Sequence, residues 1–532
     1  MLKTALAFGD RMVLQREKTV AVWGTAEPSE TVEVWMQGKR AAATSDTDGN
    51  WIAYCGPYET SFEETMTVRS GTEQLTFSQV QVGEVWLAGG QSNMEFHMRY
   101  DADFPSEQAS CKNDNIRFFD YPEVSYVGQI DEADYTKEYG RWRRADPENL
   151  ERFSAVGYYF ARELQARLKV PVGIIGCNWG GTPACAWMSE EAIREGGGQI
   201  YLEEYAAALQ KLDLEAYEAQ FRQNPMSYQT DLLANPISDM MMFGCTPETF
   251  AAKLAELGVD LSNMAALLPS VGPKYERRPS GLYESMLGQL VPYALRGFLY
   301  YQGETDGDTH PACYKTLFPA LIRNWRELWR EELPFLFVQI APLERWMDCV
   351  GEHYVAIREA QQHTADTVPG TGMAVITDVG MQHDIHPKKK QPVGYRLALL
   401  AEKQVYGQEV LAEAPTLIDA ELREGELILR FAHAGDGLSL RERLPYGQSA
   451  QADRLGGLQV FRDGQLLEGE HLCAAVEGDR VILRSEQLRA EAETEVRLAK
   501  TGWYLVNLYN SAGLPARPGC VKAQRQSGSV LK

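Results

Sequence analysis

The sequence is typical of an α/β protein whose central part is preceded and followed by β-structure. Short, nearly continuous apolar runs occur along the middle of the chain, and amphipathic stretches with helical spacing separate several of them. Buried parallel strands have this apolar character because helices cover both faces of their sheet. Near both ends of the chain, apolar and polar residues alternate instead with a period of two. We therefore expect an α/β sandwich flanked by N- and C-terminal β-domains.

The first 79 residues are predicted to form a small antiparallel β-domain. Alternating runs such as TVAVWGTA, TVEVWMQG, WIAYCG and TMTVRSG follow one another, and turn residues such as Asp48-Gly49 separate them. Alternation with this punctuation indicates short strands with one buried face.

The central α/β part is predicted to comprise residues 80–195 and 280–405. Helical spacing predicts helices over 157–170 and 316–333. The apolar runs that we predict as buried strands are 85–90, 170–181, 295–304, 333–343 and 372–380.

Residues 196–279 are predicted to form a mainly helical insertion. The stretches 201–224 and 247–258 are rich in alanine and glutamate with helical spacing, and a structureless loop of this length would be unusual inside a compact domain. From 406 to 532, runs such as GELILRF and RVILRSE predict a C-terminal β-domain.

Composition limits the classes of function. The chain has 532 residues and a net charge of -22, so most of its surface would repel nucleic acid and anionic membranes. A neutral small molecule or oligosaccharide is the easier partner, and a homo-oligomer stays open. The start has no apolar signal region and no run approaches the roughly 20 residues of a membrane span, so we expect a cytoplasmic protein. The nine cysteines show no CxxC spacing and are expected to be reduced.

Polar residues follow four of the five predicted strands. In an open parallel sheet, ligands bind at the carboxyl ends of the strands, so these residues are expected to meet there. A serine among them, Ser92, needs a base to accept its proton, and His386 is the candidate. The G-x-S-x-G elbow of α/β-hydrolases is not satisfied, because Met94 stands where the second glycine belongs. Backbone N–H groups at Gly180 and Gly181, or a side-chain amide at Gln302 or Asn93, could bind an oxyanion.

The motifs at these strand ends resemble those of the sialate O-acetylesterase family within the SGNH hydrolases. They are GQSNM (90–94), WGGT (179–182), YQGE (301–304) and DIHP (384–387), together with MVLQR (12–16), PSGLY (279–283) and NLYN (507–510). The resemblance covers most of the chain and implies a flavodoxin-like α/β/α catalytic domain flanked by β-domains. It also implies hydrolysis of acetyl esters on sugars without a cofactor. No metal is expected, because the sequence shows no further cluster of ligands.

The resemblance also implies roles for individual residues. Ser92 is the expected nucleophile and His386 the general base, with the oxyanion hole formed by Ser92, Gly180, Gly181 and Gln302. Asp384 is favoured as the third member of the triad, although the wider superfamily has its aspartate three positions before the histidine. Glu304, Asp378 or a Ser–His dyad are the alternatives. Substrate binding is expected at Gln91, Asn93, Trp179 and Tyr283.

Two further positions depart from the family pattern. Asp306 stands where asparagine is common, and Cys185 stands where glutamate is expected. Both departures concern the choice of substrate more than the chemistry.

Simpler interpretations compete with these roles. Ser92 could cap the following helix. His383 and His386, with Asp378 nearby, could bind a metal. The short basic run Lys388-Lys389-Lys390 is expected to be exposed at a helix start.

The predicted function is hydrolysis of O-acetyl esters on sugars, with sialic acid as the first candidate. Fragments of xylan, mannan or xyloglucan are alternatives with the same chemistry. A carbohydrate-binding relative without catalytic activity is the alternative from another class.

Overall fold

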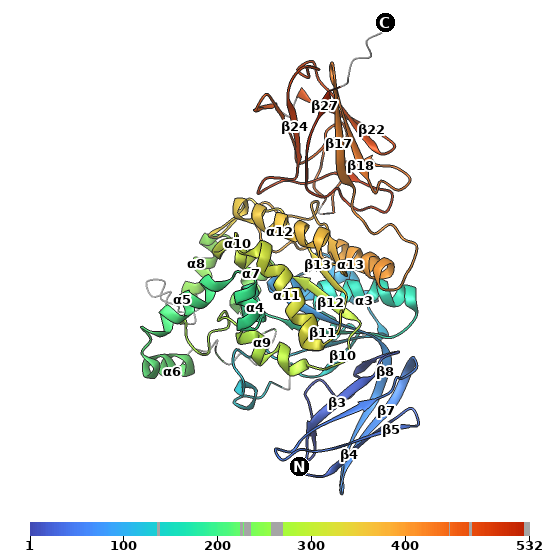
Figure 1. The fold of residues 1–532 in the computed structure, drawn as a ribbon, viewed down its shortest axis with the longest axis vertical. Coiled ribbons are helices and arrows are strands. Elements are labelled where there is room, and N and C mark those ends of the chain that lie inside the picture. The colour runs from blue at the N-terminus through green and yellow to red at the C-terminus, as the bar shows by residue number, and fades with distance from the viewer. Residues whose placement is uncertain are drawn as a thin grey trace.

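The middle of the chain folds into a mostly parallel sheet covered by helices (Figure 1). The structure, a computed structural model, describes residues 1–135, 139–223, 227, 233, 236–256, 270–445, 447–467 and 471–525. Neighbours in the sheet run in the order β10, β9, β11, β8, β12, β13 and β16, and only β10 is antiparallel to its neighbour. These strands are β8 (Glu73–Gly90), β9 (Asn113–Asp120), β10 (Trp142–Ala145), β11 (Val172–Asn178), β12 (Gly297–Tyr301), β13 (Phe335–Val338) and β16 (Thr371–Ala374).

Each of the five predicted apolar runs overlaps a strand of this sheet. The edge strand β10 and its neighbour β9 were not predicted. β9 begins with the polar residues Asn113, Asp114 and Asn115 and is buried only from Ile116 onward, so its apolar run is too short to identify it.

Helices cover both faces of the sheet. On one face α3 (Ala155–Leu168) packs against α13 (Gln391–Gln404), and on the other α11 (Tyr314–Trp329) packs against α12 (Tyr354–Thr367). Trp86 of β8 contacts Phe160 of α3, whereas a Cβ at Gly89 would lie 2.5 Å from Trp325 of α11. Side chains alternate along a strand, so positions 86 and 89 face opposite sides of the sheet. α3 and α11 confirm the helices predicted at 157–170 and 316–333.

One long strand, β8, joins the N-terminal β-structure to the central sheet. Its first half pairs with β7 and β2, and its second half, from Glu84, pairs with β11 and β12. The predicted boundary at 79/80 falls within this strand, a few residues before the change of partners at Glu84. The other N-terminal strands are β1 (Lys3–Thr4), β2 (Val13–Gln15), β3 (Val20–Thr25), β4 (Thr31–Met36), β5 (Lys39–Thr44), β6 (Asn50–Cys55) and β7 (Ser61–Ser70).

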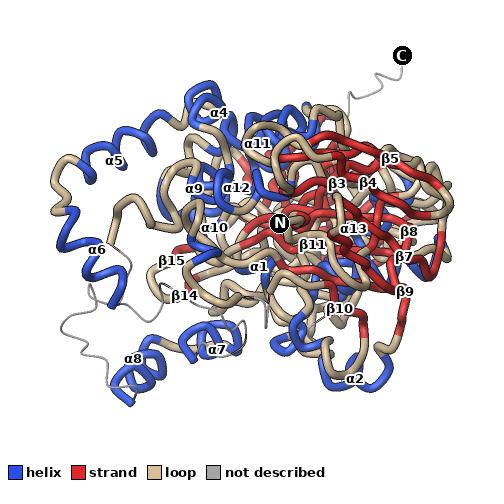
Figure 2. The backbone as a smooth tube through the Cα atoms, turned by 90° about the horizontal axis from the view of Figure 1, so that it is seen from below, coloured by secondary structure: helices blue, strands red, loops and turns tan. Residues whose placement is uncertain are grey.

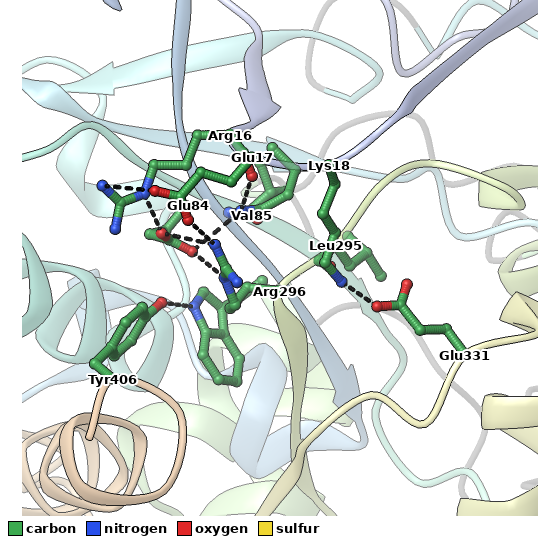
Figure 3. A network of polar contacts seen from close by, with 11 residues as sticks. Arg16, Glu17, Lys18, Glu84, Val85, Leu295, Arg296, Glu331 and Tyr406 are labelled. Atoms are coloured by element: carbon green, nitrogen blue, oxygen red, sulfur yellow. Dashed lines mark hydrogen bonds and ion pairs between the residues drawn. The ribbon is translucent and has the colours of Figure 1, made fainter. Parts of the chain in front are cut away.

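A polar network surrounds the middle of β8 (Figure 3). The Glu84 side chain is fully buried and accepts hydrogen bonds from Gln15, Arg16 and Arg296. Beside it, Lys18 donates to the Leu295 carbonyl at 2.8 Å and pairs with Glu331. The network therefore ties the N-terminal strands to the segment that leads into β12.

Short helices occupy the regions between the central strands, and Figure 2 shows α5, α6 and α8 standing beside the strand-rich part of the molecule. Helices were predicted over 201–224 and 247–258. The structure has α5 and α6 in the first range and α8 in the second, and residues 224, 257 and 258 lie outside the described residues. The remaining helices are α1 (Ser92–Glu95), α2 (Phe104–Ser110), α4 (Glu190–Glu195), α5 (Gln199–Leu209), α6 (Leu214–Gln223), α7 (Pro236–Phe243), α8 (Pro247–Glu256), α9 (Gly281–Ser285) and α10 (Glu304–Thr309).

The C-terminal region is built of strands with a hydrophobic core of their own, as the alternation predicts. Its two larger sheets have the strand orders β22-β23-β18-β17-β27 and β21-β20-β24-β26. Outside this region, in the central part of the chain, β14 and β15 form a separate antiparallel pair before α12. The bounds are β14 (Arg345–Trp346), β15 (Cys349–Val350), β17 (Thr416–Arg423), β18 (Glu426–Ala432), β19 (Ser439–Leu440), β20 (Leu458–Arg462), β21 (Gln465–Leu467), β22 (Cys473–Glu477), β23 (Arg480–Arg484), β24 (Thr494–Leu498), β25 (Leu508–Tyr509), β26 (Gly519–Lys522) and β27 (Gln524–Arg525).

Candidate active site

Ser92 lies directly after β8, at the carboxyl end of the central strand. Gly90 has a φ of +131°, and a Cβ there would lie 2.2 Å from the Tyr301 carbonyl oxygen, so only glycine fits this close turn. Gln91 is the N-cap of α1 and Ser92 its first helical residue. Ser92 is therefore not the helix cap, and its hydroxyl is available for another partner.

That partner is His386. The Ser92 Oγ and His386 Nε2 lie 3.0 Å apart, and both side chains are buried at the end of the sheet. Burial lowers the pKa of His386 to about 4, against the opposing effect of the nearby Asp384 carboxylate. The ring is therefore neutral near pH 7, which is the state that accepts a proton from a serine hydroxyl.

Asp384 stands beside the other nitrogen of the same ring. Its Oδ1 lies 3.6 Å from His386 Nδ1, and the same oxygen accepts the backbone N–H of His386 at 2.8 Å. His386 Nδ1 has no hydrogen-bond partner within the described residues, because the Asp384 carboxylate is too far away to form a hydrogen bond with it. Burial raises the pKa of Asp384, but His386 and Lys388 outweigh it and hold the pKa below its usual value.

The two alternative acids have other partners. Glu304 accepts the Asn93 side-chain amide at 2.6 Å, and burial raises its pKa to about 7. Asp378 makes two bonds of 2.7 Å to Arg396 and accepts the Tyr509 hydroxyl at 2.8 Å. Of the three candidate acids, Asp384 is the one whose carboxylate lies beside the His386 ring in the described part of the chain, at 3.6 Å from Nδ1.

Gly180 brings a backbone N–H next to the serine. A Cβ on Gly180 would lie 3.3 Å from the Ser92 Cβ, so the absence of a side chain permits this approach. Within the described residues, no acceptor faces the N–H groups of Ser92 or Gly181. The Gly180 N–H, in contrast, donates to Glu95 Oε2 at 2.6 Å.

Gln302 does not present its amide to this hole, which corrects the expectation from the sequence. The side chain is fully buried, and its Nε2 donates to Asp306 at 2.5 Å and to the Thr182 carbonyl at 3.3 Å. Its Oε1 accepts the hydroxyls of Tyr300 and Tyr314. The amide is therefore used within the core of the sheet.

The two amides beside the serine are also occupied to different degrees. Asn93 donates to Glu304 and to the Ile385 carbonyl, and its Oδ1 accepts Lys390 Nζ at 2.5 Å. Gln91 lines the cavity and uses its Oε1 for two backbone N–H groups after β12, at 3.4 and 3.3 Å. Gln91 Nε2 donates no hydrogen bond within the described residues, whereas both ends of the Asn93 amide are bonded to other segments.

The basic run is only partly exposed, contrary to the prediction. Lys390 is fully buried, and its ammonium group lies over the rings of Phe96 and Tyr301. Lys389 pairs with Asp103. The run does precede a helix, since α13 begins at the next residue.

A cavity of about 370 Å³ opens above Ser92 and His386. Trp179, predicted to bind substrate, lines it, whereas Tyr283 of α9 is absent from its lining among the described residues. Met242 of α7 also lines it, and the Met242 carbonyl accepts Lys388 Nζ. A helix of the predicted insertion therefore forms part of the wall.

Comparison with known proteins identifies the type of enzyme. The profile of a family described as carbohydrate esterase, sialic acid-specific acetylesterase, matches residues 222–399. The sialate O-acetylesterase of Mus musculus is 26% identical over 438 residues, which cover 75% of this chain and 73% of the mouse protein. The human enzyme of the same name is 25% identical over 443 residues, covering 75% and 70%. A carbohydrate acetylesterase from Xanthomonas citri, known from its crystal structure, is 28% identical and aligns over 98% of this chain and 99% of its own, with a TM-score of 0.70.

The chain is similar to sialate O-acetylesterases over 75% of its length and to a carbohydrate acetylesterase over 98% of its length. It is accordingly a carboxylic ester hydrolase, as the motifs at the strand ends predict. The two departures from the pattern of this esterase family lie outside the lining of the cavity among the described residues. Asp306 accepts bonds from Tyr201 and from the Ala184 N–H, and Cys185 is a buried thiol whose pKa burial raises.

Several residues around the esterase cavity were not predicted. Glu95, Arg277, Trp346 and Met242 all line it. Only Glu95 could have been found from local pattern, because it follows Ser92 by three positions in a helix and such residues share a face. The others come from distant segments.

The structure was also searched for metal-binding clusters and for membrane-spanning helices. In the ranges that the structure describes, no group of three or more histidine, cysteine, aspartate or glutamate side chains could hold a metal ion. His383, part of the alternative metal site, is exposed, whereas His386 is buried against Ser92. No described helix combines the length and apolar character needed to cross a membrane.

Proposed function

We propose that this esterase removes O-acetyl groups from sugars through an acetyl-enzyme formed on Ser92. The observation that carries the proposal is the 3.0 Å contact between Ser92 Oγ and His386 Nε2 at the floor of a cavity. The assignment to the SGNH hydrolases, with a flavodoxin-like catalytic domain, belongs to the same proposal.

The proposed reaction follows from the positions of these groups. Ser92 Oγ attacks the acetyl carbonyl while His386 Nε2 accepts its proton, and the N–H groups of Ser92 and the 180–181 glycines receive the oxyanion. His386 then returns the proton to the sugar oxygen as the ester C–O bond breaks. Water, deprotonated by His386, attacks the acetyl-enzyme and releases acetate. Asp384 stabilises the imidazolium that forms in both steps.

Acetylated sialic acid is the first candidate substrate, because the mammalian relatives are named sialate O-acetylesterases. Acetylated xylan, mannan and xyloglucan fragments are the alternatives, since the Xanthomonas relative is named only a carbohydrate acetylesterase. Acetate release from a panel of these sugars distinguishes them. A cytoplasmic location and the absence of a nucleic-acid partner stay part of the proposal.

The nucleophile is tested with 4-nitrophenyl acetate and a fluorophosphonate. Ser92→Ala is expected to lower kcat by at least about 1000-fold and to abolish labelling, because the base then has no nucleophile to activate. Ser110→Ala, an exposed serine on α2, is the matched control and should match the wild type. Equal hydrolysis by Ser92→Ala and wild type would contradict the assignment, and an inactive wild type that still binds acetylated sugars would favour a carbohydrate-binding relative.

A further inference from the structure

Glu95 is a carboxyl group inside the cavity that the proposed reaction does not use. It ends α1, and its Oε2 accepts the Gly180 N–H at 2.6 Å. A Cβ built on Gly180 would lie 3.1 Å from this oxygen and 3.3 Å from the Ser92 Cβ. The carboxyl oxygen and the nucleophilic side chain therefore lie against the same side of Gly180.

This position conflicts with the role expected of Gly180. Its N–H is predicted to donate to the oxyanion that forms when Ser92 attacks the ester. An N–H engaged in a short bond to a carboxyl oxygen cannot make a second short bond in the same direction. The ester oxygen must therefore displace Glu95 before this donor can act on it.

The surroundings of Glu95 are mainly acidic. Asp120 and Glu123 interact with it from the end of β9, and the hydroxyl of Tyr139 is buried near the same carboxyls without a hydrogen-bond partner in the described residues. The negative charge of Glu95 also contributes to raising the pKa of Tyr100. The cations nearby are Arg143 and Arg152, which act on Asp120, and Arg277, which lines the same cavity and lies against Gly181. Lys388 and Lys390 approach Phe96 and His386.

We propose that Glu95 is a positioning residue that occupies the Gly180 oxyanion donor in the free enzyme and releases it to the ester only when the carboxyl is protonated. This inference rests on the proposed acyl transfer at Ser92. It adds a residue that sets when the oxyanion hole is available, and the acid–base pair of Ser92 and His386 is unchanged.

The physical reason is the difference between the two states of the carboxyl. An ionised carboxylate makes a charge-assisted bond, roughly twice as strong as a neutral one, and is harder to displace from the N–H. It also places a negative charge beside the oxygen that becomes negative in the tetrahedral intermediate. Burial raises the pKa of Glu95 to about 7, although the Gly180 N–H opposes this effect. The change of state therefore falls in the neutral range.

The test is the pH dependence of kcat/KM for 4-nitrophenyl acetate, followed at the isosbestic wavelength of nitrophenol and corrected for spontaneous hydrolysis. In the wild type, kcat/KM is expected to fall by about tenfold per pH unit well above pH 7, because the active form of Glu95 is the protonated one. Glu95→Gln keeps the shape and an acceptor for Gly180 but cannot ionise, so its profile should stay level there. Glu95→Met, which has a similar volume and no acceptor, should also stay level and serves if the glutamine variant does not fold.

Two carboxyl variants in the same cavity serve as controls. Asp308→Asn removes a carboxylate of the same cavity that accepts the Tyr354 hydroxyl. Glu304→Gln removes the other carboxyl whose pKa burial raises to about 7. Both variants should keep the alkaline fall, whatever their absolute rate.

The inference would be overturned if Glu95→Gln and Glu95→Met kept the alkaline fall, or if Glu304→Gln lost it. The rate of inactivation by a fluorophosphonate, measured by intact mass, should show the same pH profile, since the phosphonyl oxygen uses the same hole. Failure of the proposed function is a separate result: Ser92→Ala would then retain hydrolysis, whatever the pH profile of the Glu95 variants.

Discussion

Asn93 is held from both sides by buried ionisable groups, and this arrangement fixes the residue that follows the nucleophile. Lys390 donates to its Oδ1 at 2.5 Å, and its Nδ2 donates to Glu304 at 2.6 Å. Burial lowers the pKa of Lys390 to about 7 and raises that of Glu304 to about 7. Because the Asn93 amide uses both of its ends in these bonds, Asn93 ties α1 to the end of β12 and to the segment that carries His386.

Removing this amide should cost both stability and rate. Asn93→Ala leaves Lys390 and Glu304 without their partner, and an unsatisfied buried polar group costs about 1–3 kcal/mol. We expect a loss of this size in urea unfolding and a fall in kcat of at least about tenfold, because the serine loses its anchor. Wild-type kcat in a folded Asn93→Ala variant would show that Asn93 does not position Ser92.

The acid side of the pH profile should report His386. Below a pH of about 4 the imidazole is protonated and cannot accept the Ser92 proton, so kcat/KM should fall as the pH drops through this value. Rapid assays in the acid range, checked for reversible loss by return to neutral pH, measure this limb. A midpoint near the ordinary histidine pKa of about 6.5 would contradict the effect of burial.

At the scale of single elements, β8 is the strand that joins the N-terminal β-structure to the central sheet and leads to Ser92. It pairs first with β7 and then with β11 and β12, and it ends at the turn before Ser92. Glu84 marks the change of partners and receives the side chains of Arg16 and Arg296 (Figure 3). The N-terminal strands therefore support the same strand that places the nucleophile.

Glu84→Gln should destabilise the protein strongly. Breaking a buried ion pair by removing one partner typically costs about 3–5 kcal/mol, because the other charge stays without compensation. Here Arg16 and Arg296 are still partly accessible, so we expect a loss near about 3 kcal/mol in urea unfolding. Glu331→Gln, a half-exposed carboxylate in the same network, is the control and should cost less than about 1 kcal/mol. Equal effects of the two changes would contradict the importance of burial here.

At the scale of the whole molecule, Asp378 links the central sheet to the C-terminal strands. It follows β16, pairs with Arg396 of α13 and accepts the hydroxyl of Tyr509 in β25. This position explains why a carboxylate near the histidine motif in the sequence is not its partner in space.

Asp378→Asn and Asp384→Asn should therefore fail in different ways. The first should lower stability by about 3 kcal/mol, since it leaves Arg396 buried without its counter-charge, and leave kcat of the folded enzyme near that of the wild type. The second should lower kcat by at least about 100-fold, because the imidazolium loses its stabilising carboxylate. A large kcat loss in Asp378→Asn alone would reverse the assignment.

The alternation near the ends of the chain, the five apolar runs and the polar residues that follow them are local features. They predicted the layers of the molecule and placed Ser92 and His386 at one edge of the sheet, because parallel strands bring their carboxyl ends together, whereas the family resemblance was needed to give the two residues their roles. β9 was missed because its first three residues are polar, and β10 was missed because it is a four-residue strand that contains two arginines, so both carry a weak apolar pattern.

Packing between distant segments decided the remaining features. Gln302 and Asn93 have the side chains expected of an oxyanion donor, but buried partners from other segments use their amides. Lys390 belongs to a basic run that suggests exposure, yet it is fully buried. Glu95 reaches Gly180 only because β8 and β11 are neighbours in the sheet. The periodicity of a segment determines which strands and helices form, whereas a polar atom's partners depend on what the fold brings against it, since burial removes the water that would otherwise satisfy it.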